Sequence, residues 1–200
     1  MKKNIFKYLI EFLIVAFGVF LGSYANERQN EKKSNRNKEK AIENIISELE
    51  NNKEKLENTI EYHQSIKIYF DSIIPTIPEE TYKELFIKNK GFEYYKYKAW
   101  KGKGFAEFEI TAFETAKMSG TLQNMDIQLL QNISYIYNQI EIVSDFEKMI
   151  SNRMTKVGYD TKILDVMMSI GVITGDNLLM EKRLIKKIEK SIINIKMNAQ

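Results

Sequence analysis

Cysteine is absent from this chain, and histidine occurs once and proline twice in 200 residues. Without cysteine, disulfide bonds and thiolate chemistry are excluded, whereas both redox compartments stay open. His63 alone cannot supply a metal site built from several histidines. The two prolines, Pro75 and Pro78, lie close together, so no proline interrupts the rest of a sequence rich in Lys, Glu and Ile. This composition predicts a mostly helical protein.

Sequence signatures of catalysis are missing as well. The chain has no P-loop, no dinucleotide-binding glycine pattern, no HExxH helix and no EF-hand loop. The spacings of Glu107, Glu109 and Glu114 do not place these three carboxylates on one helix face, and no Glu-x-x-His accompanies them. We therefore predict a protein that is not an enzyme, without catalytic residues, metal ligands or a cofactor.

The positive charge is concentrated at one end of the chain. The net charge is +3 at pH 7, but residues 1–40 carry nine basic and four acidic side chains, which leaves a net −2 for the remainder. Nucleic-acid binding requires a basic face on the folded domain. The distribution therefore argues against nucleic acid as a partner.

An apolar stretch of 18 residues, Tyr8–Ala25, contains a single charge, Glu11. As a helix it spans about 27 Å, close to the hydrocarbon thickness of a bilayer. We predict a single membrane span, with the side on which the C-terminal domain lies left open. The alternative is a signal peptide cleaved after Ser23-Tyr24-Ala25, which would leave a secreted helical binding domain. Glu11 interrupts the apolar region and favours the retained anchor.

One face of the expected span carries its polar and small residues. Glu11, Val15, Gly18 and Gly22 follow at spacings of three and four, so they share a helix stripe. Gly18 and Gly22 form a small-xxx-small motif, which permits close approach of two helices. We predict that this stripe is a helix–helix interface in the membrane. Alternatively, Glu11 lies shallow enough to reach the headgroups.

Beyond the anchor (residues 1–25), residues 26–74 are expected to form a helical stalk. Its polar start leads into a heptad of Ile42, Leu49, Leu56, His63 and Phe70, typical of a coiled-coil-like packed helix that ends before Pro75. His63 lies on the apolar stripe. We interpret it as a core residue with one hydrogen bond, with a pH-sensing role as the alternative.

Residues 75–105 are predicted to be an irregular connection that mixes lysines with aromatics. The candidate surface contacts are Lys96, Lys98, Trp100 and Lys101. Such mixing suits nucleic acid or a membrane interface. The alternative, which we favour, is that the aromatics of Asn89–Phe105 cover the helices beneath them.

Residues 106–200 are expected to complete a helical bundle that packs on the stalk. The apolar periodicity predicts helices over 106–118, 124–156, 160–170 and 178–198, with the second of them antiparallel to the stalk. Gly120 is the expected left-handed end of the first helix. Gly171 and Gly175 are expected to mark a turn, with Asp176 or Asn177 capping the last helix. The predicted fold is all-α.

Two stretches resemble a family of small uncharacterised single-span bacterial membrane proteins, frequent in Bacteroidetes. They are YLIEFLIVAFGVFLGSYANERQNEKKSNRNKEKAIENIISELENN and FETAKMSGTLQNMDIQLLQNISYIY. The two stretches together make up 70 of the 200 residues. It implies a one-span protein with a helical domain, and it implies no activity.

These observations lead to one functional hypothesis and two alternatives. We expect a membrane-anchored helical scaffold, adaptor or sensor whose partners are the lipid bilayer and either a second copy or another membrane protein. The first alternative is a membrane-active effector in defence or toxicity that acts by clustering of its anchors. The second is the secreted helical binding domain described above.

Overall fold

The computed structural model describes residues 2–88 and 92–198. The helices in chain order are α1 (Lys2–Ile73), η1 (Ile74–Thr76), η2 (Glu79–Lys83), η3 (Tyr94–Lys96), α2 (Thr111–Met118), η4 (Thr121–Asn124), α3 (Ile127–Thr155), α4 (Ile163–Val172), η5 (Ile173–Asn177) and α5 (Leu178–Asn198). In the described part of the chain there is no strand, and only Leu85 and Lys162 form an isolated antiparallel bridge. The expected all-α class is confirmed.

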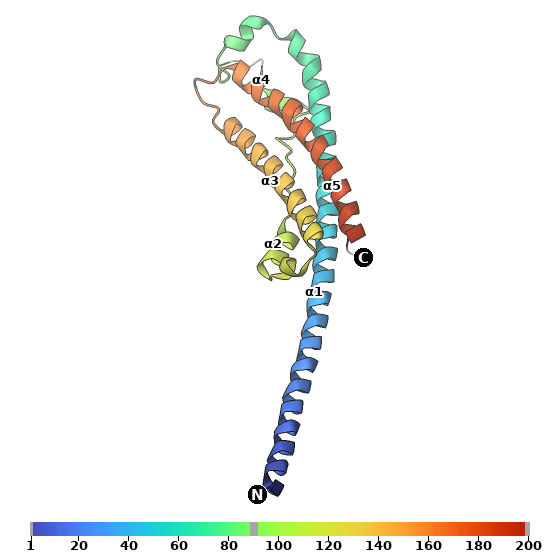
Figure 1. Cartoon of the computed structure of the whole chain (residues 1–200). Helices are drawn as coiled ribbons and strands as arrows, with labels where there is room; N and C mark the ends of the chain where they lie inside the picture. The colour runs from blue at the N-terminus through green and yellow to red at the C-terminus, as the bar shows by residue number, and fades with distance from the viewer. Residues whose placement is uncertain (1, 89–91, 199–200) are drawn as a thin grey trace.

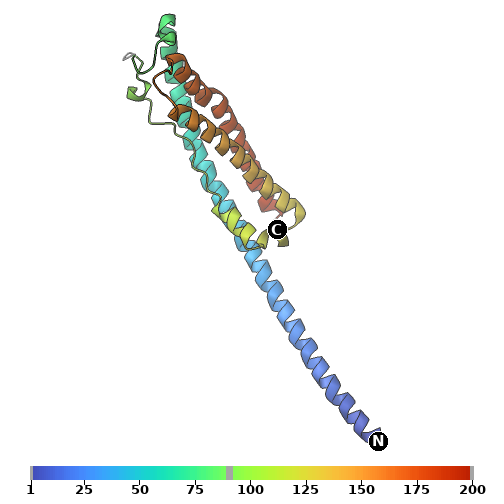
Figure 2. The same cartoon turned by 90° about the vertical axis from the view of Figure 1, so that its left-hand side faces the viewer.

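Helix α1 runs through the whole molecule as one uninterrupted helix of 72 residues. Figure 1 shows its N-terminal part extending alone beyond the bundle, while its C-terminal part lies alongside the other helices. The turned view in Figure 2 agrees. Among the α1 side chains whose burial is described, the first buried one is Ile42, and the helix ends at Ile73, two residues before Pro75. The expected anchor and stalk therefore form a single rod of roughly 108 Å.

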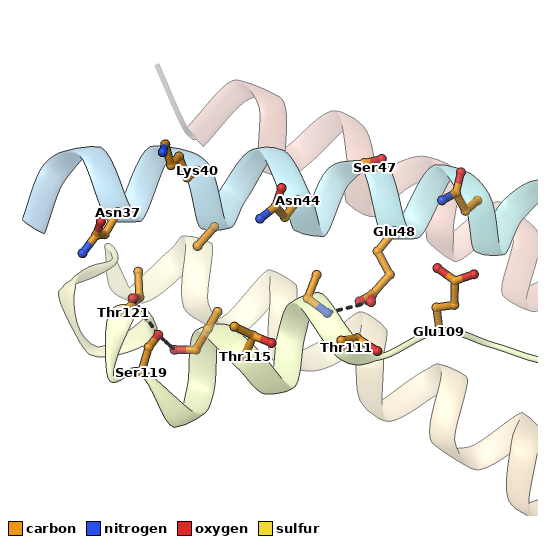
Figure 3. Close-up of a pocket in the computed structure, with 14 residues that line it drawn as sticks. Asn37, Lys40, Asn44, Ser47, Glu48, Glu109, Thr111, Thr115, Ser119 and Thr121 are labelled. Carbon is orange, nitrogen blue, oxygen red and sulfur yellow. Dashed lines mark hydrogen bonds between the residues drawn. The ribbon is translucent and has the colours of Figure 1, made fainter.

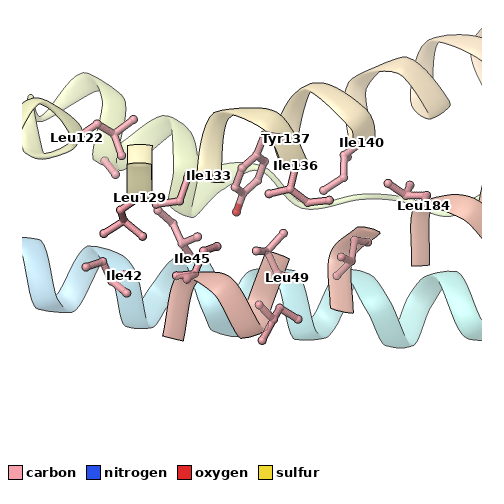
Figure 4. Close-up of a cluster of buried hydrophobic side chains, with 14 of the residues drawn as sticks. Ile42, Ile45, Leu49, Leu122, Leu129, Ile133, Ile136, Tyr137, Ile140 and Leu184 are labelled. Carbon is pink, nitrogen blue, oxygen red and sulfur yellow. The ribbon is translucent and has the colours of Figure 1, made fainter. Parts of the chain in front are cut away.

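The main core lies where α1, α3 and α5 come together. Figure 4 shows part of it, with side chains of α1 such as Ile45 and Leu49 facing side chains of α3 that include Tyr137. The buried apolar residues of the three helices are Ile42, Ile45, Leu49, Leu56, Leu129, Ile133, Ile136, Tyr137, Ile140, Val143, Leu184, Ile188, Ile192 and Ile195. The backbone of α5 lies close to both α1 and α3. The expectation that α3 is the antiparallel partner of α1 is therefore wrong, because α5 occupies that place.

A second apolar cluster closes the end of the bundle distant from the N-terminus. Its buried members are Ile66, Phe70, Phe92, Ile163, Val166 and Ile170. Partly buried aromatic side chains pack around them, including Trp100 and Tyr97. This cluster fixes the connection after Pro75 against α1 and α4.

Helices α4 and α5 are joined without a turn. The segment between them, Ile173–Asn177, is a π-helix, and the backbone conformation stays helical on both sides of it. The expected turn at Gly171 and Gly175 is therefore wrong. Asn177 does not cap α5 from outside, because it is a fully buried helical residue. Inserted residues of this kind reorient the side chains that follow, and they are frequent at functional sites.

The predicted helix over 106–118 begins later than expected, at Thr111, and ends beside Gly120, whose φ of 72° confirms the left-handed end. Residues 101–110, here called the strap, are neither helix nor strand. They run antiparallel to α1, since Tyr62 contacts Gly102 at one end and Asn52 contacts Glu109 at the other. The strap thus follows the polar side of α1 instead of forming a helix of its own.

Side chains of α1 hold the backbone of the strap. The Asn52 amide donates to the Glu109 carbonyl at 2.7 Å and accepts from the Glu109 N–H at 2.7 Å. Lys55 donates to the Glu107 carbonyl, and Tyr62 donates to the Gly102 carbonyl at 2.6 Å. Gly104 has a φ of +69°, and a Cβ there would lie 2.2 Å from the Tyr62 ring, so this position requires glycine.

Asn52 provides a test of this arrangement. Asn52→Ala leaves the N–H and the carbonyl of Glu109 without their partners, so we expect the free energy of unfolding to fall by about 2–3 kcal/mol. Chemical denaturation of the full-length chain in detergent measures the change. Asn58→Ala, on the exposed side of the same helix, is the matched control and is expected to change it by less than about 0.5 kcal/mol. Equal effects of the two changes would contradict the role of Asn52.

Candidate functional site

The predicted membrane interface lies on a part of α1 that nothing else in the protein covers. Val15 is 65% exposed, and apart from the glycine itself, its two chain neighbours and the nearby backbone of its own helix, no atom lies within 4 Å of a Cβ placed on Gly18 or Gly22. Glu11 forms an ion pair with Lys7 at 3.9 Å, one turn earlier on the same face. The stripe of Glu11, Val15, Gly18 and Gly22 is therefore open to a partner or to lipid.

Within the described part of the chain, two helices are long and apolar enough to cross a membrane by length and composition. The first begins at Ile10 on α1, and none of its apolar window is buried in the protein. The second comprises Ile163–Asn198, of which 44% of the window is buried. The packing of the second against α1 and α3 accounts for its apolar side. Membrane association is thus indicated weakly, and by the exposed N-terminal segment more than by the packed one.

The basic-aromatic segment separates into two kinds of side chain, with residues 89–91 outside the described part of the chain. Trp100 packs edge-on against Phe70 and Tyr94, at centroid distances of 6.5 and 5.0 Å. Lys96 is paired with Glu93 at 2.7 Å, whereas Lys98 and Lys101 are exposed. Most of the aromatic side chains therefore cover the helices beneath them, as the favoured interpretation expected, whereas Tyr95 is 52% exposed.

A polar groove of about 530 Å³ lies between α1 and α2 (Figure 3). Its buried carboxylate, Glu48, accepts hydrogen bonds from the Ala112 N–H at 2.7 Å and from the Tyr137 hydroxyl at 2.5 Å. Because Ile110 provides no side-chain cap for α2, Glu48 supplies it from α1. Burial and the bond to Glu48 hold the pKa of Tyr137 far above its ordinary value, so this phenol stays a donor. Through these hydrogen bonds, the Glu48 side chain joins α1, α2 and α3.

The most unusual site is a cluster of buried polar groups at the centre of the bundle. His63 of α1, Asn177 of η5 and Glu181 of α5 are fully buried, and Glu147 of α3 is 4% exposed. Both carboxylate oxygens of Glu181 lie within 3.0 Å of His63 Nδ1. The other ring nitrogen, Nε2, donates to the Lys103 carbonyl of the strap at 2.7 Å. Asn177 Nδ2 donates to Glu181 at 2.6 Å.

The carboxyl group of Glu147 faces the same cluster. Burial, followed by the nearby charge of Glu181, raises the pKa of Glu147 to about 8, against contributions from Asn177 and the backbone of Ala106 that lower it. Burial also raises the pKa of Glu181, and hydrogen bonding to His63 opposes that rise. Glu147 Oε1 and Asn177 Oδ1 are buried without a hydrogen-bond partner in the structure. Helices α1, α3, η5 and α5 thus bring buried polar and ionisable side chains together at the centre of the bundle.

Sequence reasoning placed His63 in the core with one hydrogen bond, whereas it has two. It did not find Glu147, Asn177 or Glu181. A signal was present, since the apolar stripe of α3 is interrupted near Phe146, where Glu147 takes the inward position. Glu181 likewise occupies an inward position one turn before Leu184. Charged residues at core positions of an amphipathic helix are rarely buried unless they are paired.

The described residues contain no group of three or more His, Cys, Asp or Glu side chains placed to hold a metal ion. Comparisons of the chain with protein-family models, with curated proteins and with solved structures gave no match. The predicted relation to the bacterial single-span family stays a prediction. The chemistry of the site must therefore be argued from its own geometry.

The pKa of Glu147 predicts a dependence of stability on pH. Between about pH 4.5 and about pH 8, the folded chain holds a proton on Glu147 that the unfolded chain has released. Unfolding then releases this proton, so the free energy of unfolding falls as the pH rises, by up to about 1.4 kcal/mol per pH unit. Because glutamine cannot release a proton, Glu147→Gln is expected to remove the part of this pH dependence of the free energy of unfolding that comes from Glu147.

Denaturation of the full-length chain at several pH values across that window measures the slope. Glu141→Gln, on the exposed side of α3, is the control and is expected to follow the unmodified chain. If the Glu147→Gln variant keeps the slope of the unmodified chain, Glu147 does not hold the proton.

Proposed function

We propose that the protein is a membrane-anchored helical adaptor or sensor that acts through protein–protein contacts. One observation carries the proposal. The apolar segment of α1 has no cover within the protein, yet it continues without a break into the helix around which the bundle is built. A helix of this composition leaves water by entering a bilayer or by packing against other helices.

The geometry of α1 supports contact through one face of the span. An α-helix completes about five turns in 18 residues, so Gly18, Arg36 and Glu54 lie on one side of the rod. The buried Ile45 and Leu56 lie on the opposite side. The stripe with Glu11, Gly18 and Gly22 therefore points away from the bundle. A second copy could approach this face without meeting the α2–α5 region.

Beyond Arg36, the same face carries exposed acidic side chains, among them Glu43, Glu54 and Glu61. Two copies paired through the span would bring these like charges towards each other, which is unfavourable. Pairing is then confined to the apolar part of α1, and the two rods diverge above it. Each bundle stays free to bind a different partner.

Membrane fractionation and crosslinking test this proposal. We expect the full-length chain to stay in the membrane pellet after a carbonate or high-salt wash, because a spanning helix is not released by screening of charge. Single cysteines placed along residues 11–25 of the cysteine-free chain are expected to form crosslinks that peak at 11, 15, 18 and 22. We expect the peak at these positions because close packing at Gly18 and Gly22 brings the backbones of the two paired helices together.

Gly18→Ile combined with Gly22→Ile is expected to abolish these crosslinks, while Leu13→Ile on the opposite side leaves them unchanged. Glu11→Gln is expected to weaken them less than the glycine changes, because the amide still hydrogen-bonds. Recovery of the chain in the soluble fraction would reject the anchor. A flat crosslinking profile in the pellet would reject self-pairing alone.

A further inference from the structure

Helix α3 is apolar on two sides, and only one of them is covered. Its buried side packs in the main core. On the other side, Tyr135, Ile142 and Met149 repeat every seven residues and are between 46% and 57% exposed, with the half-buried Phe146 between the last two. The exposed side of a surface helix is ordinarily polar. A seven-residue repeat of apolar side chains, here called the outer stripe, is the pattern at which helices pair.

One edge of the outer stripe is basic. The Lys187 ammonium of α5 donates to Gln139 Oε1 of α3 at 2.5 Å, so α5 runs along this edge. Arg183 and Lys190, one turn before and one turn after Lys187, are exposed on the outer side of α5. Among the residues that the structure describes, none of these three cations belongs to an ion pair. The edge therefore carries three cations that are available to an acidic surface.

The opposite edge of the outer stripe is acidic. The exposed Asp145 lies about 60° around α3 from the middle of the stripe, on the side away from Gln139. Glu141, one turn earlier, is exposed a little further round. Asp145 pairs with Lys148 of the same helix at 2.9 Å, and exposed pairs of this kind contribute little to stability. The outer stripe thus separates a basic edge from an acidic one.

We propose that the outer stripe, with these two edges, is an interface at which a second copy of this chain pairs, with the two α3 helices parallel. A two-fold axis along α3 turns the basic edge of each copy towards the acidic edge of the other. Because α5 runs opposite to α3 and Lys187 is level with Gln139, Arg183 is level with about residue 143 of α3. The Arg183 guanidinium then faces Asp145 and Glu141 of the second copy.

The charges oppose an antiparallel arrangement. A two-fold axis across α3 would leave the basic edges of the two copies on the same side, so that Arg183, Lys187 and Lys190 of one copy meet those of the other. Juxtaposed like charges are unfavourable. In the parallel arrangement, both copies also enter the same bilayer through α1, as the proposed anchor requires. Pairing with a second copy therefore satisfies the charge pattern and the anchor together.

The size of the face suits a contact between anchored copies. From Tyr135 to Arg153 the outer side of α3 is about 28 Å long, and with α5 beside it the face is about 20 Å wide. A pair then buries roughly 1,100 Å² in total, which is near the low end of specific interfaces. Copies held in one bilayer meet at raised effective concentration, which favours a contact of this size.

The outer stripe and the stripe of Gly18 and Gly22 point in different directions. The first faces away from the core, and the second points away from the bundle. One copy therefore cannot turn both towards the same neighbour. When both contacts form, each copy has two neighbours, and the copies join in a row along the membrane. The row rests on the proposed pairing of spans, whereas the contact at the outer stripe does not.

Disulfide crosslinking in membranes tests the interface in a chain whose spans cannot pair. The background is the full-length, cysteine-free chain with Gly18→Ile and Gly22→Ile. In this background Ile142→Cys, close to the two-fold axis, is expected to give a disulfide-linked dimer. Lys148→Cys, exposed on another side of α3, is the control. It is expected to give roughly tenfold less dimer, because the two Cα atoms lie too far apart for a disulfide.

Reversal of charge tests the orientation of the pair. Arg183→Glu alone and Asp145→Lys alone are each expected to lower the Ile142→Cys crosslink roughly threefold, which corresponds to one exposed ion pair. The two changes together are expected to restore the crosslink, because they exchange the two signs across the interface. An antiparallel pair or a different partner predicts no restoration, so its absence would overturn the parallel pairing.

The remaining outcomes separate this interface from the pairing of spans. No crosslink at 142, equal crosslinks at 142 and 148, or a crosslink from 142 to a different protein would overturn the interface. Crosslinks along residues 11–25 of the chain with its own glycines, without any at 142, would reject the outer-stripe contact and keep the span pairing. A crosslink at 142 without any along 11–25 would support the outer-stripe contact and reject the span pairing alone.

Discussion

A non-helical segment that crosses a helical bundle must find a partner for each of its buried backbone groups, and this requirement organises the structure. The strap lies between α1 and α3, so its N–H and C=O groups have no neighbouring strand to bond to. The side chains of Asn52, Lys55, Tyr62 and His63 supply the partners from one side of α1. At the start of α2, the Glu48 side chain of α1 likewise accepts a hydrogen bond from a backbone N–H. The inward side of α1 therefore carries two kinds of residue: apolar side chains that pack in the core, and polar side chains that hydrogen-bond the backbone of the strap.

The helices with strong apolar periodicity are those that the sequence predicts best. The bounds of α5 agree with the expected 178–198, and α3 agrees to within a few residues at its start. Periodicity fails where a segment owes its conformation to another part of the chain. Residues 106–110 have a composition compatible with a helix, but the amide of Asn52 binds the backbone of Glu109 and keeps it non-helical. No local pattern reveals a partner 57 residues away.

The candidate site also divides into residues that local spacing predicts and residues that only the folded chain brings together. The stripe of Glu11, Val15, Gly18 and Gly22 could be assigned from spacing alone, because all four residues belong to one helix. The buried cluster could not, since its members come from α1, α3, η5 and α5. The π-helix is the reason that even the local prediction failed at Asn177: one inserted residue turns this side chain inwards. Glycines at 171 and 175, which favour a turn, are tolerated inside the continuous helix.

The unbroken course of α1 gives the protein a mechanical property. From Ala25, where the apolar stretch ends, to Ile73, the helix forms a lever of about 70 Å. A tilt of about 10° at the end near Ala25 would therefore displace the far end of the rod by roughly 12 Å, which is about one helix diameter. The aromatic cluster around Phe70 and Trp100 lies at that far end. If the apolar segment spans a bilayer as proposed above, a small reorientation there becomes a large translation at the tip, and stiffness of the rod, rather than any contact within the bundle, transmits it.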